Sequence, residues 1–84
     1  MVVGKRHDLE EDDFSLEIGE YGKSPDGVWY CRVPATGFGV GSLLKHTVTE
    51  HEDGTITVSP SILCTGHLEK QWHGYLERGI WREV

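Results

Sequence analysis

Basic residues and long apolar runs are scarce in this sequence, and each scarcity argues against a class of protein. Eight Lys and Arg residues stand against fourteen Asp and Glu residues, giving a formal charge of −6. Proteins that bind duplex DNA or RNA gather basic residues on one surface. No apolar run approaches the roughly 20 residues of a membrane span, and the first residues lack the apolar stretch of a signal peptide. We therefore expect a cytoplasmic protein without membrane contact or direct nucleic-acid binding.

The negative charge is concentrated near the N-terminus. Residues 1–20 hold seven acidic and two basic residues, whereas residues 21–84 hold seven acidic and six basic residues. Residues 8–13 contain one apolar residue, Leu9, which is too little to bury. The pattern predicts an acidic, flexible N-terminal arm at residues 1–13 and a single small β-rich domain at residues 14–84. Such an arm either stays solvated or docks on a basic surface of a partner.

A chain of 84 residues has room for one hydrophobic core. Eleven glycines and three prolines fall mostly between runs rich in β-branched and aromatic residues, which is typical of strands and turns. Strands are expected at residues 14–18 and 28–33, with a glycine-thinned one at residues 38–44. Only residues 65–71 suit a short helical turn. The sequence predicts a mainly β fold, a compact antiparallel sheet of short strands and two hairpins with at most one helical turn.

The first predicted hairpin covers residues 46–59. A three-residue loop ending at Gly54 pairs Val48 with Val58 and gathers both on one face with Ile56. A two-residue loop would place Val48 on the opposite face. We therefore predict the three-residue loop.

The second predicted hairpin covers residues 73–84. By the same reasoning its loop ends at Gly79 and pairs Leu76 with Ile80. Aromatic residues are the expected anchors of the core or of an interface. They are Tyr21, Trp29, Tyr30, Trp72, Tyr75 and Trp81.

Two cysteines and five histidines carry the distinctive chemistry of the sequence. Cys64, His67 and His73 follow the spacing C-x2-H-x5-H, and Cys31 lies on an earlier predicted strand. Two thiolates and two imidazoles would fill a closed tetrahedral zinc site, and zinc would stabilise a domain with a small core. The alternative is a metal-free protein with Cys31 buried as a small hydrophobic residue. The spacing leaves both interpretations open.

Catalytic patterns are not evident. Cys64 could stand beside His67 or His73 as a nucleophile and base, but no acid at a characteristic position completes a triad. The glycines of residues 37–41 lack the downstream helix and the Lys-Ser/Thr pair of a phosphate loop. We therefore expect a protein that is not an enzyme.

Residues 46–84 contain a run of motifs with a family resemblance. They are Thr55-Ile56-Thr57-Val58-Ser59-Pro60-Ser61-Ile62, then Trp72-His73-Gly74-Tyr75-Leu76 and Gly79-Ile80-Trp81. This part resembles a group of small uncharacterised proteins of actinobacteria and their phages, related to a bacterial domain of unknown function. The resemblance implies a zinc site that uses cysteines and a late histidine. His73 matches that histidine and Cys31 matches an early cysteine, whereas Lys70 stands where the family has a cysteine.

Three functional hypotheses follow. The first is a non-enzymatic protein-binding module, phage-encoded and acting on a host protein, with aromatic side chains as anchors. The second is a zinc-stapled domain, whose metal could support hydrolysis if one ligand position is open to water. The third is an acidic mimic of nucleic acid, whose carboxylates present phosphate-like charge to a DNA-binding protein. The protein partner is either a host protein or a second copy.

Overall fold

The protein is described by a computed structural model that covers residues 1–84. The regular structure consists of short β-strands and one 3-10 turn, so the mainly β prediction is confirmed. No helix in the structure has the length and apolar character needed to cross a membrane. The elements are β1 (Val2–Val3), β2 (Lys5–Arg6), β3 (Glu20–Lys23), β4 (Trp29–Cys31), β5 (Gly41–Ser42), β6 (Thr47–Glu50), β7 (Ile56–Thr65), η1 (His67–Glu69), β8 (Gln71–Glu77) and β9 (Ile80–Glu83).

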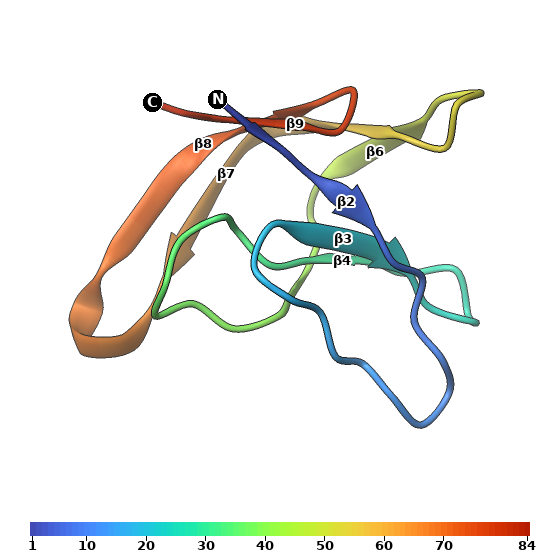
Figure 1. Ribbon diagram of the computed structural model, residues 1–84, viewed down its shortest axis with the longest axis horizontal. Coiled ribbons are helices and arrows are strands. Elements are labelled where there is room, and N and C mark those ends of the chain that lie inside the picture. Colours follow the sequence, from blue (N-terminus) through green and yellow to red (C-terminus); the bar gives the residue numbers. More distant parts are fainter.

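The strands form two sheets that enclose the core between them (Figure 1). The five-stranded sheet has the order β1-β9-β8-β7-β6 and is antiparallel. The four-stranded sheet has the order β2-β3-β4-β5 and contains one parallel pair, β2 with β3. The register of β7 against β8 shifts between Val58 and Ile62, where the Ser59–Pro60 peptide bond is cis.

The N-terminal strands join the two sheets along one side. β1 pairs with β9 in the five-stranded sheet, and β2 pairs with β3 in the four-stranded sheet. Between them, the Gly4 N–H donates to the Gly79 carbonyl at 2.7 Å, and the Lys5 N–H donates to the Gly19 carbonyl at 3.2 Å. A Cβ on Gly4 would lie 2.8 Å from Trp81 Nε1, so this crossing point requires glycine.

The predicted division of the chain after residue 13 has no counterpart in the strand pairing. The segment before it supplies β1 and β2, and the Leu9 N–H donates to the Lys23 carbonyl at 3.0 Å. The Leu9 side chain is 6% exposed. Composition shows too few apolar residues for independent order, but it does not show that neighbouring strands offer backbone partners. The flexibility of this segment stays a prediction.

The hairpin of β6 and β7 has the predicted register. Val48 lies opposite Val58, and Glu50 lies opposite Ile56. Gly54 has a φ of +88°, and its N–H donates to the His51 carbonyl at 3.0 Å. The alternation of buried side chains across the two strands therefore identified the loop length correctly.

The hairpin of β8 and β9 differs from the prediction by one residue. Glu77 pairs with Ile80 and Leu76 pairs with Trp81, so the loop contains two residues, not three. Both loop residues have positive φ, +47° for Arg78 and +76° for Gly79, as in the type I′ turn that suits tight hairpins. This register buries Leu76 and Trp81 together, which the predicted pairing would not have done.

Residues 14–18 do not form the predicted strand. Of the three alternating apolar residues, only Leu16 is buried, while Phe14 and Ile18 are exposed. Phe14 packs edge-on against Tyr30 with ring centroids 5.1 Å apart. The Leu16 carbonyl accepts from the Arg32 guanidinium at 3.0 Å instead of from a neighbouring strand. The prediction was wrong because alternation does not ensure that a pairing partner is present.

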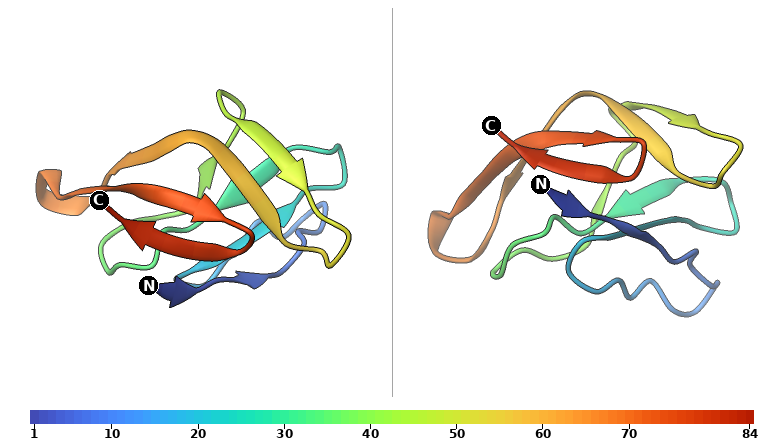
Figure 2. Two further views of the ribbon diagram at one scale, coloured as in Figure 1. Left: turned by 90° about the horizontal axis from the view of Figure 1, so that it is seen from above. Right: turned by 45° about the horizontal axis from the view of Figure 1, so that its top comes forward.

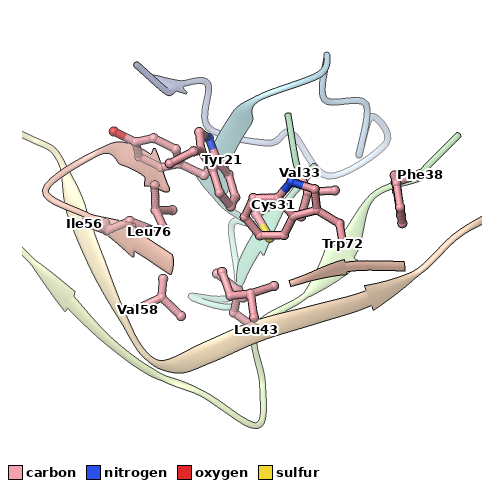
Figure 3. Close-up of a cluster of buried hydrophobic side chains, with 11 residues drawn as sticks. Tyr21, Cys31, Val33, Phe38, Leu43, Ile56, Val58, Trp72 and Leu76 are labelled. Atoms are coloured by element: carbon pink, nitrogen blue, oxygen red, sulfur yellow. The ribbon is translucent and has the colours of Figure 1, made fainter. Parts of the chain in front are cut away.

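The core lies between the two sheets, and strands of both supply it (Figure 3). Tyr21 and Cys31 come from the four-stranded sheet, whereas Trp72, Leu76 and Trp81 come from the five-stranded sheet. The Trp72 and Trp81 rings meet edge to face at 5.5 Å. Of the six aromatic anchors expected from the sequence, Tyr21, Trp72 and Trp81 are buried, and Trp29, Tyr30 and Tyr75 are half-buried.

Candidate functional site

The two cysteines lie on the inner side of the sheets. Cys31 is 3% exposed and its sulfur lies within the core cluster (Figure 3). Burial, together with the nearby Cys64, raises the pKa of the Cys31 thiol to about 12. Cys64 is half-buried and packs against the core, and burial raises the pKa of its thiol as well. Both groups are therefore disfavoured as thiolates in this structure.

The two histidines of the predicted zinc site are both exposed. His73 is exposed on β8 and pairs with exposed Leu63, whereas the next pair along the ladder joins Cys64 to buried Trp72. Successive strand residues point to opposite faces, so His73 and Cys64 are on different sides of the sheet. His67 is exposed in the η1 turn.

The structure therefore does not bring the four predicted ligands together. No three side chains among His, Cys, Asp and Glu lie close enough to hold a metal ion. Spacing along the chain placed three of these residues near one another, but the alternation of the strands separates their side chains. Zinc binding stays a prediction from the sequence.

Two hydroxyl–imidazole pairs were not foreseen. His73 Nε2 lies 2.9 Å from Ser61 Oγ, and His51 Nε2 lies 2.7 Å from Thr57 Oγ1. The same Thr57 hydroxyl accepts from the Arg78 backbone N–H at 3.0 Å, linking the two hairpins. A hydroxyl beside a histidine is the first part of a nucleophilic site, and a third group that orients the histidine is the second. No carboxylate accepts a hydrogen bond from either imidazole; the His73 contact joins β8 to β7, and the His51 contact joins the hairpin loop to β7.

The edge of the five-stranded sheet at β6 is unpaired. β6 has β7 on one side only, and no backbone pairing joins it to β5, the free edge of the other sheet (Figure 2). The His51 N–H donates to the Thr55 carbonyl at 2.8 Å. In an antiparallel ladder every second residue forms such bonds, so Thr49 and Thr47 bond to β7. The backbone N–H and C=O groups of Val48 and Glu50 consequently point outward from the sheet.

An apolar groove lies beside this unpaired edge. It has a volume of about 240 Å³ and lies where β4, the turn before β6 and β6 itself converge. The lining residues are Gly27, Val28, Trp29, Leu43, Leu44, His46 and Val48. Leu44 is 70% exposed, so part of this apolar surface faces solvent.

His46 in this lining has one unsatisfied nitrogen. Its Nε2 lies 3.2 Å from the Ser61 carbonyl, which can only accept, so Nε2 carries the proton. The other nitrogen, Nδ1, is an acceptor in this tautomer, and it is buried without a hydrogen-bond partner. Buried polar atoms are rarely left unpaired. The atom is almost completely inaccessible to solvent, so it is not a binding group of the groove surface.

Arg6 on β2 bonds to the end of β6 and to the hairpin loop that follows it. The Arg6 guanidinium donates to Glu50 Oε2 at 2.8 Å, to the Gly54 carbonyl at 3.0 Å and to Asp8 Oδ1 at 2.9 Å. Hydrogen bonding to Arg6 lowers the pKa of both Asp8 and Glu50. Arg6 also lies 5.0 Å from the Trp29 ring centroid. The Glu50 side chain is thus turned toward β2, while its backbone faces the open edge.

Fold and site together define a small two-sheet β protein, joined along one side by its N-terminal strands and presenting an unpaired strand and an apolar groove on the other. Comparisons with protein-family models, with curated proteins and with solved structures found no match.

Proposed function

We propose that this chain is a non-enzymatic protein-binding module that takes an extended strand of a partner protein along the edge of β6. The unpaired backbone of β6 beside an apolar groove is the observation that carries this proposal. Strand addition supplies affinity through main-chain hydrogen bonds, and pockets beside the edge supply specificity. Val48 and Glu50 provide the outward-facing donors and acceptors.

The composition of β6 supports this function. Free edges are usually protected from pairing by short length, by charged side chains, by proline or by a bulge. β6 is four residues long, Thr-Val-Thr-Glu, contains no lysine, proline or bulge, and favours extended structure. Its one charge, Glu50, is bound by Arg6 and does not project from the edge as a free charge. The edge is therefore open to a second strand.

The groove indicates the chemistry of the added strand. Val28, Trp29 and Leu44 offer an apolar surface to one of its side chains, and burial of such a side chain contributes about 1.5–3 kcal/mol. An extended segment with an apolar residue opposite the groove meets this condition.

Peptides selected from a random display library, with the chain immobilised at low density, provide the test. In the free protein we expect the Val48 and Glu50 amides to exchange rapidly and the Thr49 amide to exchange slowly. A bound peptide should slow exchange at Val48 and Glu50 by about tenfold or more, because their N–H groups become hydrogen-bonded.

Substitutions in the groove complete this test. Leu44→Asp should weaken peptide affinity by about tenfold, since it places a charge beside the apolar contact. Leu63→Asp is the matched control, because Leu63 is similarly exposed but lies on the outer face of β7. Peptides that bind Leu44→Asp with unchanged affinity and leave both amides unprotected would refute the proposal.

A further inference from the structure

A second depression adjoins the β3–β4 turn. It has a volume of about 380 Å³ and is lined by Glu11, Phe14, Pro25 and Asp26. Its walls are the loop after β2 and the β3–β4 turn, which Figure 1 shows at the same end of the four-stranded sheet. An aromatic ring and two carboxylates therefore share one depression, which we call the Phe14 pocket.

The carboxylates of the Phe14 pocket have no basic partner within the chain. No ion pair involves Glu11 or Asp26. Asp26 accepts a hydrogen bond from the Ser24 hydroxyl through Oδ1 alone. Residues 10–13 are all acidic and add negative charge along the same wall. The pocket is therefore complementary to a positively charged group.

Phe14 favours one kind of cation. Its ring is 41% exposed although it packs against Tyr30, so part of the ring is open to a ligand. A guanidinium stacks on an aromatic ring while its N–H groups donate to carboxylates beside the ring, and it is less strongly hydrated than an ammonium group. The ring and the two carboxylates together therefore favour arginine over lysine.

The Phe14 pocket is continuous with the proposed strand-binding surface. Pro25 and Asp26 line the pocket, and the next two residues, Gly27 and Val28, line the apolar groove. Consecutive Cα atoms are about 3.8 Å apart, so one peptide group separates the two linings. A segment whose apolar residue fills the groove has the pocket within reach of a neighbouring arginine side chain.

We infer that the Phe14 pocket takes an arginine side chain of the segment that is added at β6; this inference rests on the proposed function of that edge. The apolar residue of the segment occupies the groove, and the guanidinium lies against Phe14 with Glu11 and Asp26 as acceptors. The partner therefore contributes a basic extended segment to a chain whose formal charge is −6.

The library peptides selected for the proposed function also test this inference. We expect arginine to be enriched at one fixed position relative to the apolar residue, because hydrogen bonds across the β3–β4 turn hold the pocket and the groove at a fixed separation. Replacing that arginine by citrulline, which is neutral and of similar shape, should weaken binding by about tenfold, since the contacts of the charge with both carboxylates and with the ring are lost. Isothermal titration calorimetry measures the affinities.

Glu11→Gln connects this loss to the pocket. The Glu11 side chain is exposed, so the variant should fold as the unsubstituted chain does. The loss on replacing arginine by citrulline should shrink from about tenfold to about threefold, because one carboxylate contact is already absent. Glu69→Gln is the matched control. It removes the same charge from an exposed residue of η1, outside the pocket and the groove, and should keep the tenfold loss.

The outcomes distinguish this inference from the proposed function. Selected peptides without arginine enrichment, equal affinities for arginine and citrulline peptides, or a loss that is the same in Glu11→Gln as in the unsubstituted chain would each overturn the arginine pocket. If library peptides still protect the Val48 and Glu50 amides from exchange, the proposed function stands without it. If no peptide protects these amides, both fail.

Discussion

Arg6 shows how one side chain connects distant parts of this chain. Its guanidinium joins β2 to Asp8, to Glu50 on β6 and to the Gly54 carbonyl in the hairpin loop. The pKa values of both carboxyls are lowered because they accept hydrogen bonds from a permanent cation. Carboxyls with a lowered folded-state pKa stabilise the fold above their ordinary pKa, and this contribution is lost as the pH falls through the lowered value.

Arg6→Gln should therefore change the acid dependence of stability. For the unsubstituted chain we expect the free energy of unfolding to fall as the pH decreases from about 5 to about 2. In Arg6→Gln the decline should be shallower, because the pKa values of Asp8 and Glu50 return toward their ordinary range. Urea denaturation at several pH values measures this difference. Arg82→Gln, which removes an exposed ion pair to Glu77, is the control and should leave the slope unchanged; equal slopes for Arg6→Gln and the unsubstituted chain would contradict this account.

At the scale of elements, the two hairpin turns differ in how closely they are packed. Gly54 and Gly79 both have left-handed backbone conformations. A Cβ on Gly54 would meet only the end of the Arg6 side chain, at 3.8 Å. A Cβ on Gly79 would lie 2.8 Å from Tyr21 Oη and 3.0 Å from Thr55 Cγ2. The second turn therefore requires glycine for two reasons: its φ is positive, and a Cβ would collide with Tyr21 and Thr55.

Alanine at each position should separate these two requirements. Gly54→Ala should lower the free energy of unfolding by about 1–2 kcal/mol, the cost of a left-handed conformation. Gly79→Ala should cost about 1–3 kcal/mol more, because the buried Tyr21 side chain must shift. Urea denaturation gives both values. Equal losses for the two variants would show that the crowding around Gly79 is relieved without cost.

At the scale of the whole molecule, the core joins the two sheets into one unit. Tyr21 and Cys31 from one sheet share a cluster with Trp72 and Trp81 from the other. The N-terminal strands also bond to both sheets. If either sheet unfolded alone, the core residues of the other sheet would be exposed to solvent. We therefore expect the two sheets to unfold together.

Cooperative unfolding is the corresponding prediction. In a Trp29→Phe variant, which lacks the one tryptophan of the four-stranded sheet, fluorescence reports on Trp72 and Trp81 in the five-stranded sheet. Far-ultraviolet circular dichroism reports on strands of both sheets. The two signals should give coincident urea transitions, as expected of a single cooperative domain. A separate earlier transition in circular dichroism would show that the four-stranded sheet melts independently.

Local patterns predicted the parts of this fold that depend on near neighbours in the chain. The β6–β7 hairpin is an example, since only one loop length places Val48, Ile56 and Val58 on one face. The predicted register of the second hairpin was wrong by one residue, because its loop is compatible with two turn types. Burial of Leu76 together with Trp81 selects the two-residue loop.

Most of the candidate site depended on contacts that no local pattern contains. The Cys64, His67 and His73 spacing suggested one cluster, but strand alternation directs Cys64 inward and His73 outward. The open edge of β6 was not foreseen, because a strand is an edge only when no other strand of the finished sheet lies beside it.

By itself, the sequence determined the mainly β character, the positions of the sharpest turns and the register of the β6–β7 hairpin. These follow from alternation and from glycine and proline, which act over a few residues. Only the tertiary structure decided that Gly4 lets the N-terminal strands cross between the sheets, and that β6 is left unpaired beside an apolar groove. Both depend on which distant strands compete for the same backbone hydrogen bonds, and that competition is resolved only when the whole chain has folded.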